Sequence, residues 1–312
     1  METDDDNSLN ASMGSFEAAV VKSKIDLKPI QLERVLLAVD RSNQDPSAIA
    51  LAADVAKRSN AIVHVLFAEG TEQTQAARDY VIECVGRAKE RGAQAEPVEQ
   101  LIVGERHQQL LKARETLGAK LIVISAPYGA EVNVTGDESL STTIDALLAE
   151  SKSPLLIVRH PHEELVESFK EVIVAATLHA KEAVDAARWA LKLVEPSGQL
   201  TLLAVADVDT VAEAAELLGD QVDKSALGEE ALKRAELRAV GALAAAITKR
   251  TAEEGINSTV DVRAGKPALL IAQAADAKHC VVCVGRTADR TSPTWHHMLD
   301  VILNAHHPVL VA

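Results

Sequence analysis

The sequence predicts an α/β fold built from two related domains in tandem. With 312 residues the chain is longer than a single domain usually is, and its content of 47% hydrophobic and 25% charged residues is that of a globular protein. Only 2% of the residues are aromatic, so Val, Ile, Leu and Ala must fill the cores. That composition is typical of buried parallel strands flanked by helices.

Short apolar runs alternate with helix-spaced segments through the first half of the chain. The expected strands are RVLLAVD (34–40), AIVHVLFA (61–68), VEQLIV (98–103), KLIVIS (120–125) and PLLIV (154–158). The expected helices are 46–59, 71–92, 104–117 and 139–150, with Gly118 as a left-handed cap of the third. Strands that alternate with helices require a parallel sheet with right-handed crossovers.

The same order of elements then repeats. EVIVAAT (171–177) matches the first strand, QLTLLAVAD (199–207) matches the second, and HPVLVA (307–312) matches the last. The second copy also carries an insertion, about 208–255, that consists of strong helix formers divided at Gly219. This insertion either covers the sheet and the neighbouring domain, or forms a lid or docking surface.

These patterns divide the chain into four parts. The predicted parts are a disordered acidic extension (1–30), a first domain (31–160), a linker (161–168) and a second domain (169–312).

Charge and cysteine content limit the partners and the compartment. A net charge of -14, with no basic stripe, repels nucleic acid and anionic membrane surfaces. The acidic start METDDDNSLNAS is unlike a secretory signal, and no apolar run approaches the roughly 20 residues that span a bilayer. Three cysteines cannot build a disulfide framework. We therefore expect a cytoplasmic protein.

Several of these segments resemble the universal stress protein family. They are the VLLAVD strand, the Gly104 turn followed by a helix and LGAKLIVIS, and the terminal SPLLIV and HPVLVA strands. The resemblance covers residues 31–312 and is closest to the tandem, double-domain type. It implies two Rossmann-like domains of the adenine nucleotide alpha hydrolase-like kind, each with five parallel strands in the order 3-2-1-4-5. It also implies a ligand crevice between strands 1 and 4, where a doubly wound sheet places its site.

ATP-binding members of this family carry a loop of the form G-x2-G-x9-G-[ST] after strand 4. Its glycines let backbone N–H groups approach the phosphates, beside the positive end of a helix. In the first copy Ser125 replaces the first glycine, and Glu138 stands where the last one belongs, beside Asp137. Two carboxylates there would lower the affinity for ATP about a hundredfold or more.

The first copy nevertheless keeps part of the family's site. Asp40 matches the aspartate at the end of strand 1 that lies near the nucleoside in binding members. The candidate nucleotide site is Asp40, Gly104, Gly129, Ser139 and Ser141. ATP is thus a ligand to consider for the first domain, and no other cofactor is expected.

The second copy departs further from the pattern. Its loop, GRTADRTSPTWHHM, keeps Gly285 but has Ala288 and Trp295 at the other glycine positions, and Thr177 replaces the aspartate. We expect the indole to fill the crevice. The basic side chains of this loop either hold another anion or are solvated: Arg286, Arg290, His296 and His297.

No catalytic or metal site is predicted. Cys280 and Cys283 have the spacing of a metal-binding motif, but residues three apart on a strand face opposite sides, so both are expected in the core. The histidine pairs 160/162, 296/297 and 306/307 have no partner at convincing ligand spacing. Motifs such as G-x-S-x-G, H-E-x-x-H and the P-loop are missing from the sequence.

We therefore expect a non-enzymatic stress-response or regulatory protein with degenerate nucleotide sites. Its two copies should pack as an intramolecular pseudo-dimer through the edge strands 154–158 and 308–312. It would act through a ligand or an unknown protein partner, and a homodimer remains open. The alternative is an ATP-binding, weakly hydrolysing protein that uses the first domain. A third reading has the second copy hold an apolar molecule or a partner helix.

Overall fold

The computed structural model describes residues 25–68, 74–99, 104–128, 140–161, 169–176, 182–208, 229–287 and 289–312. The strands of its first half are β1 (Arg34–Val39), β2 (Ile62–Phe67), β3 (Gln94–Pro97), β4 (Leu121–Ser125) and β5 (Leu155–Val158). The helices of this half are α2 (Asp45–Ser59), α3 (Gln75–Glu90), α4 (Arg106–Leu117) and α6 (Thr142–Glu150).

The second half repeats this order with one longer helix. Its strands are β6 (Glu171–Ala176), β7 (Gln199–Asp207), β8 (Asn257–Gly265), β9 (Val281–Val284) and β10 (Val309–Val311). Its helices are α7 (Ala183–Leu193), α9 (Glu229–Glu254), α10 (Pro267–Lys278) and α11 (Pro293–Asn304).

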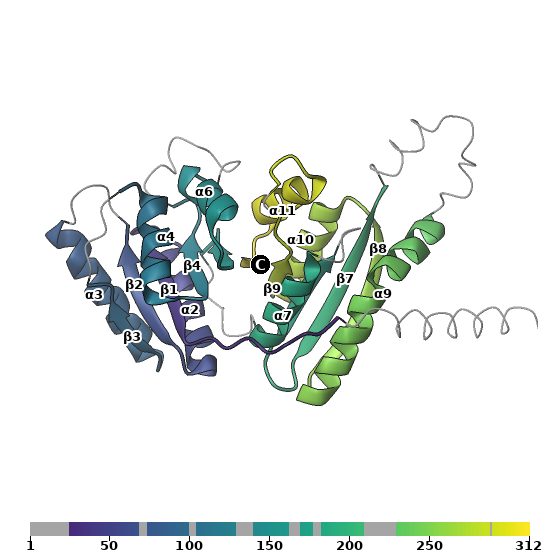
Figure 1. The fold of residues 1–312 in the computed structure, drawn as a ribbon, viewed down its shortest axis with the longest axis horizontal. Coiled ribbons are helices and arrows are strands. Elements are labelled where there is room, and N and C mark those ends of the chain that lie inside the picture. The colour runs from purple at the N-terminus through teal and green to yellow at the C-terminus, as the bar shows by residue number, and fades with distance from the viewer. Residues whose placement is uncertain are drawn as a thin grey trace, which may run out of the picture.

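All of these strands form one ten-stranded sheet, in the order β3-β2-β1-β4-β5-β10-β9-β6-β7-β8 (Figure 1). Each half therefore has the predicted order 3-2-1-4-5, and neighbours within a half are parallel. The edge strands β5 and β10 pair antiparallel, with Leu156 opposite Leu310. The two halves thus share a continuous sheet rather than a contact between side chains alone.

Helices cover both faces of the sheet and produce two apolar layers. One layer holds residues of α2, α3, α7 and α9, and the other holds residues of α4, α6, α10 and α11. Successive side chains of a strand point to opposite faces of the sheet. On β1, for example, Val35 packs in the first layer and Leu36 in the second. The predicted aliphatic core is confirmed.

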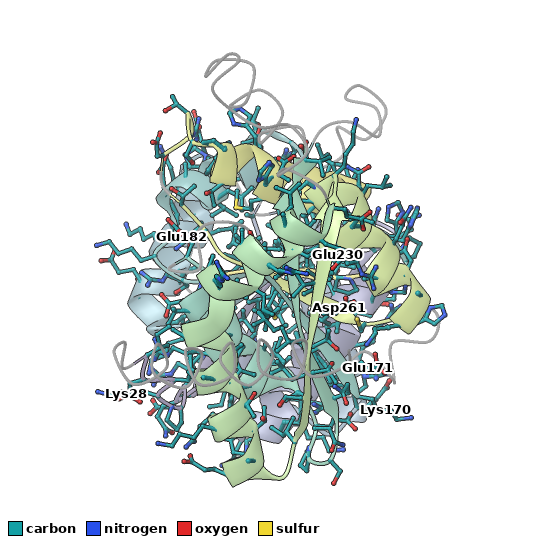
Figure 2. The ribbon with its side chains drawn as sticks, turned by 90° about the vertical axis from the view of Figure 1, so that its right-hand side faces the viewer. Lys28, Lys170, Glu171, Glu182, Glu230 and Asp261 are labelled. Atoms are coloured by element: carbon teal, nitrogen blue, oxygen red, sulfur yellow. The ribbon has the colours of Figure 1, made fainter. Side chains whose placement is uncertain are left out.

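The insertion contributes α9, which packs on β7, β8 and α7. This helix lies at the end of the molecule farthest from the first half (Figure 1), and Figure 2 views it from that end. Of the two surfaces that we expected the insertion to cover, α9 reaches the sheet of its own half and not the neighbouring half. The proposed division at Gly219 lies outside the described residues.

The third strand is not where the sequence predicted it. Strand β3 is Gln94–Pro97, paired in register with Ile62–Val65 of β2, whereas 98–103 had been expected. An edge strand has only one neighbour and tolerates polar residues, so the short run QAEP gave a weaker signal than the apolar run that follows it. Residues 100–103 lie outside the described part of the chain.

Residues 25–30, predicted to belong to a disordered extension, instead pack against the second half. Leu27 is buried, and the Arg188 Nε of α7 donates to the Lys28 carbonyl at 3.1 Å. The chain then crosses to the first half and enters β1 (Figure 1). Apolar residues in this stretch explain its order, since Leu27 and Leu32 join the core layer beneath α2 and α7. The rest of the extension is outside the described residues.

Candidate functional site

The carboxyl ends of β1 and β4 meet at a buried carboxylate, Asp45, the first residue of α2. Its Oδ2 accepts hydrogen bonds from the backbone N–H groups of Asp40 (3.1 Å) and Arg41 (2.8 Å) and from the Tyr80 hydroxyl (2.8 Å). Its Oδ1 accepts from the Ser125 hydroxyl at 2.8 Å. A carboxylate at a helix N-terminus is also favoured by the helix dipole. Asp45 therefore ties together β1, β4, α2 and α3.

Burial dominates the electrostatics of this group. It raises the pKa of Asp45 to about 6, with the nearby charge of Asp40 as the second cause, while the hydrogen bonds from Tyr80 and Ser125 act in the opposite direction. The pKa of the Tyr80 hydroxyl is raised by its own burial and by Asp45. The Asp45 carboxylate thus accepts its hydrogen bonds from other groups of the same chain.

A second buried side chain, Tyr128, lies across the same ends of the sheet. Tyr128 follows β4 and is only 1% exposed. Its hydroxyl donates to the Val39 carbonyl at the end of β1 (2.9 Å) and accepts from the Ala68 N–H just after β2 (3.0 Å). The ring therefore spans from β4 to β2. Tyr128 and Asp45 therefore both occupy space at the carboxyl ends of β1 and β4.

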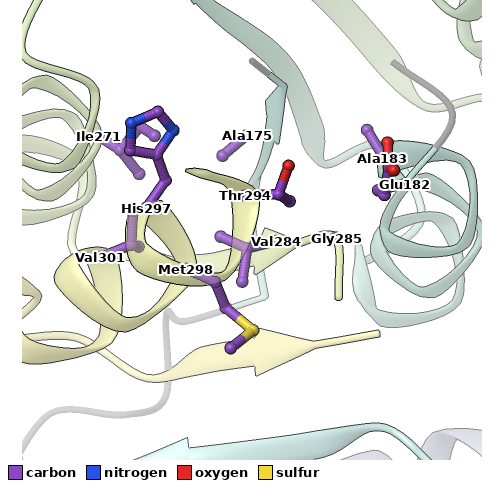
Figure 3. A pocket seen from close by; sticks show the side chains of 10 residues that line it. All are labelled: Ala175, Glu182, Ala183, Ile271, Val284, Gly285, Thr294, His297, Met298 and Val301. Carbon is purple, nitrogen blue, oxygen red and sulfur yellow. The ribbon is translucent and has the colours of Figure 1, made fainter. Parts of the chain in front are cut away.

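In the second half the crevice between β6 and β9 is closed by backbone instead. Gly285 follows β9, and a Cβ atom placed on it would lie 2.5 Å from the carbonyl carbon and oxygen of Glu182 at the start of α7. Only glycine permits this approach. What remains is a cavity of about 30 Å³ (Figure 3), which is room for about one water molecule.

A polar pair lies beside this small cavity. The His297 Nε2 of α11 is 3.2 Å from the Asp207 Oδ2 at the end of β7, and His297 and Thr294 line the cavity with Glu182. The remaining lining residues are apolar or glycine: Ala175, Ala183, Ile271, Val284, Gly285, Met298 and Val301. This cavity has room for a water molecule or a small ion.

The comparisons with known proteins bear on the fold. No family model and no curated protein matches the chain. Among solved structures, a universal stress protein from Archaeoglobus fulgidus DSM 4304 has a TM-score of 0.61 at 18% identity, over 93% of this chain and 98% of that one. The chain has the fold of the universal stress proteins.

Shorter universal stress protein structures match part of the chain. One from Archaeoglobus fulgidus, solved in complex with dAMP, has a TM-score of 0.33 at 14% identity and covers 41% of this chain and 98% of its own. Another, solved in complex with cAMP, has a TM-score of 0.32 at 23% identity and covers 42% of this chain and 98% of its own.

Of the residues predicted from the universal stress protein resemblance, Asp40 and Ser141 lie at the filled crevice. The Asp40 Oδ1 accepts the Ser42 N–H at 3.0 Å, and its own N–H is held by Asp45. Ser141 is buried at the start of α6, and its Oγ accepts the Tyr128 N–H at 3.3 Å. Both residues therefore support the residues that close the crevice.

Gly104 has a positive φ of 139° at the turn before α4. Its carbonyl accepts from Gln109 Nε2 at 2.8 Å, and a Cβ atom there would lie 2.9 Å from Gln108 Oε1. These contacts shape the beginning of α4. The two other predicted residues, Gly129 and Ser139, lie outside the described residues.

The prediction that Trp295 fills the second crevice is wrong. Thr294, His297 and Met298 of α11 line the cavity, while the Trp295 indole is buried in the core with the Arg290 guanidinium 5.5 Å from its centre. Adjacent residues on a helix point about 100° apart, so the sequence position alone does not place the ring.

The basic side chains of this loop are engaged within the protein. Arg286 donates to the Ser153 carbonyl (3.4 Å) and Arg290 to the Asp145 carbonyl (3.3 Å), and both acceptors belong to the first half. A His296 ring nitrogen is 3.0 Å from the Ser292 carbonyl. The two arginines therefore join the halves, which argues against an anion site.

The cysteines lie in the core as predicted. Cys280 and Cys283 are fully buried in different apolar layers, on opposite faces of the sheet. Burial raises the pKa of the Cys280 thiol to about 12 and that of Cys283 as well. Within the described part of the chain, no group of three His, Cys, Asp or Glu residues is placed to hold a metal ion. None of the described helices is long and apolar enough to cross a bilayer.

Sequence reasoning missed Asp45, Tyr80 and Tyr128. One signal was available, because the chain has only two tyrosines and the hydroxyls of both are bound at this crevice. The Asp-Pro start of α2 was a second signal, since a carboxylate is favoured at a helix start.

Proposed function

We propose that this protein is a tandem universal stress protein that works without catalysis, as a stress-response or regulatory protein that binds a ligand or partner. Its two nucleotide crevices are closed and do not accept ATP. The observation that carries this proposal is the buried Tyr128, whose hydroxyl is bound on both sides, to Val39 and Ala68.

To enter the crevice of the first half, ATP would have to displace the Tyr128 ring. Moving a buried aromatic ring out of its packing costs about 3 to 5 kcal/mol, and a Kd of 1 μM corresponds to about 8 kcal/mol of binding. Displacing Tyr128 would therefore weaken such binding by at least a hundredfold. In the second half the obstacle is the Glu182 backbone against Gly285, which a rotating side chain cannot relieve.

The proposal includes the arrangement of the two copies. Residues 31–160 and 169–312 act as two domains that pair within one chain, in the manner of a dimer. The pairing of β5 with β10 supports this arrangement, as does Arg58 of α2, which pairs with Glu195 and lies over the Phe169 ring. Because β5 and β10 are both used, a homodimer would have to form through another surface.

We also place the protein in the cytoplasm, with protein or small-molecule partners and no nucleic acid. All three cysteines are free thiols, in keeping with a reducing compartment. The net charge of -14 disfavours polyanions.

Isothermal calorimetry with ATP and magnesium tests the proposal. The wild-type protein, shown to be folded by circular dichroism, is expected to give no binding heat at millimolar ATP. Micromolar binding that Asp40→Ala abolishes would overturn the proposal and establish the alternative, an ATP-binding protein that uses the first half. Micromolar binding that Asp40→Ala leaves intact would also overturn it.

A further inference from the structure

The two edges of the ten-stranded sheet are unlike each other. At one edge, β3 has four residues and ends at Pro97. At the other edge, β8 has nine residues, Asn257–Gly265, with neither proline nor lysine among them. Natural edge strands are commonly short or carry proline or lysine, because these features prevent pairing with another chain. Strand β3 has this protection and β8 lacks it.

Strand β8 is also open to solvent along its length. None of its nine residues is buried, whereas eight of the nine residues of its neighbour β7 are buried. Val260 is 40% exposed, and the side chains of Asp261 and Arg263 are 38% and 37% exposed (Asp261 is labelled in Figure 2). Another chain can therefore reach this strand.

The backbone of β8 faces its neighbour and the outside in alternation. Asn257 donates its N–H to the Gly198 carbonyl at 2.9 Å, so this residue directs its backbone groups toward β7. Successive residues of a strand direct their N–H and C=O groups to opposite sides in the plane of the sheet. The residues that present these groups at the outer edge are Ser258, Val260, Val262 and Ala264.

A second copy of the chain can pair antiparallel with this edge around a two-fold axis at Val262. Val262 then lies opposite itself and Val260 lies opposite Ala264, so the two strands exchange about six hydrogen bonds. In the positions between these pairs, Asp261 of each copy lies opposite Arg263 of the other. Opposite charges directly across an antiparallel ladder are stabilising.

The charges of β8 select this register over its neighbours. An axis at Asp261 or at Arg263 would place a charged side chain opposite its own copy, which is unfavourable. An axis at Val260 would place Asp261 opposite Thr259 and form no ion pair. Within one chain, Asp261 and Arg263 are already paired at 2.7 Å, so at the Val262 axis the four groups form a cluster of alternating charge.

Helix α9 lies over the same edge, and its position along β8 can be estimated. It returns the chain from the end of β7 to the start of the parallel strand β8, so it runs antiparallel to β8. Val262 lies about 17 Å into the strand, a length that about 11 residues of helix cover. Counted back from Glu254, the turn of α9 at the height of the axis is close to Leu243.

Small residues occupy the side of this turn that faces away from α7. Arg250 lines a cavity with residues of α7, and Gly241 precedes it by nine residues, which places Gly241 on the opposite side of the helix. Ala245 follows one turn later. Because the distance between two packed helices depends on the side chains at their contact, Gly241 and Ala245 let the α9 helices of two copies approach closely at the axis.

We propose that the chain forms a homodimer in which the β8 strands of two copies pair antiparallel about Val262 and join the two ten-stranded sheets. The backbone groups of the outer edge hold the strands together, and Asp261 and Arg263 fix their register. Strands β5 and β10 are already paired with each other, so this surface remains for a second copy. The dimer does not depend on whether the crevices accept ATP.

Sedimentation velocity over a range of micromolar concentrations measures the dissociation constant of the dimer. The decisive variants each reverse one charge: Asp261→Arg and Arg263→Asp. Each places like charges across the axis when it pairs with itself, but the two variants are complementary when they are mixed. The control is Glu115→Arg, which makes the same change of charge as Asp261→Arg at an exposed position of α4. Circular dichroism checks that each variant is folded.

We expect the wild type and Glu115→Arg to dimerise with equal affinity, and each single variant to dimerise at least tenfold more weakly. An equal mixture of Asp261→Arg and Arg263→Asp should dimerise at least tenfold more tightly than either variant alone, because each charge then faces an opposite one.

Val262→Pro replaces the charge variants if one of them does not fold. It removes an N–H group from the outer edge and leaves the bonds to β7 intact, so it should also weaken the dimer at least tenfold. A monomeric wild type, a dimer that the folded variants do not weaken, or a mixture that dimerises no more tightly than its components would overturn the proposal.

Discussion

The two halves of the sheet have one strand order but close their crevices by different physical means. The first half uses side chains: Tyr128 spans the strand ends, and Asp45 collects hydrogen bonds beneath it. The second half uses backbone, because Gly285 lets the start of α7 approach β9. A repeated fold therefore does not preserve the chemistry of its site, and in the proposed function each half closes the same crevice in its own way.

The two halves also differ in the hydrogen bonds made by a buried carboxylate. Asp45 of the first half accepts hydrogen bonds from backbone and hydroxyl groups. Glu236 of α9 is fully buried, and neither of its side-chain oxygens has a hydrogen-bond partner. One carboxylate is therefore expected to stabilise the fold and the other to weaken it.

The largest effect is expected from Tyr128→Ala. Removing a buried aromatic side chain leaves a cavity and should lower the free energy of unfolding by about 3 to 5 kcal/mol. Urea denaturation followed by circular dichroism measures this change. Tyr128→Phe serves as the control, because it keeps the ring and loses only the two hydrogen bonds. A loss below about 1 kcal/mol for the alanine variant would mean that the ring does not fill the crevice.

Gly285→Ala tests the backbone closure of the second half. The added methyl group would meet the Glu182 backbone at 2.5 Å, and such overpacking should cost about 1 to 3 kcal/mol. Gly86→Ala is the matched control, since a Cβ atom on Gly86, within α3, meets nothing within 4 Å. That control should stabilise the protein by about 0.5 to 1 kcal/mol. Equal melting temperatures for the two variants would remove the argument for a tight second crevice.

Asp45→Asn should destabilise the first half by about 1 to 3 kcal/mol at pH 8, because an amide NH₂ would face groups that can only donate or are already bound. The contribution of Asp45 to stability decreases as the pH rises. The pKa of Asp45 is raised from 3.8 to about 6, so its contribution to stability is highest below pH 3.8 and falls as the pH rises through 6. Thermal unfolding of both proteins between pH 4 and 8 measures it, and a gain in stability for the asparagine variant at pH 8 would contradict the assignment.

Glu236→Gln should have the opposite effect, a gain of about 1 to 2 kcal/mol at pH 8. Burial raises the pKa of Glu236 from 4.5 to about 7, so the stability that it provides when protonated is lost as the pH rises through 7. The gain should therefore disappear at pH 4. Glu115→Gln, an exposed position on α4, is the control, and an equal gain there would show a general charge effect.

The sequence predicted most of the fold because periodic patterns and repeated strands are local signals. The alternation of strands and helices, the Gly118 cap and the buried cysteines followed from them, whereas the order of the strands was implied by the universal stress protein resemblance. The third strand was misplaced, since QAEP is a short and polar edge strand whose position is decided by β2.

The site was harder to predict than the fold. Asp40 and Ser141 were found, but as supports for Tyr128 and Asp45 rather than as open ligand contacts. Tyr128 lies in a loop without periodicity, and its partners Val39 and Ala68 are distant in the chain. For Trp295, the helix rotation that turns the ring away from the crevice depends on packing, which the family's glycine pattern does not contain.

The most direct test of the closed crevices is a crystal structure of the wild-type protein soaked with about 10 mM ATP and magnesium, roughly ten thousand times a Kd of 1 μM. The account predicts Tyr128 bound to the Val39 carbonyl and the Ala68 N–H, the Glu182 backbone against Gly285, and no nucleotide density between β1 and β4 or between β6 and β9. Nucleotide density in either crevice, with Tyr128 turned outward or α7 displaced, would contradict it.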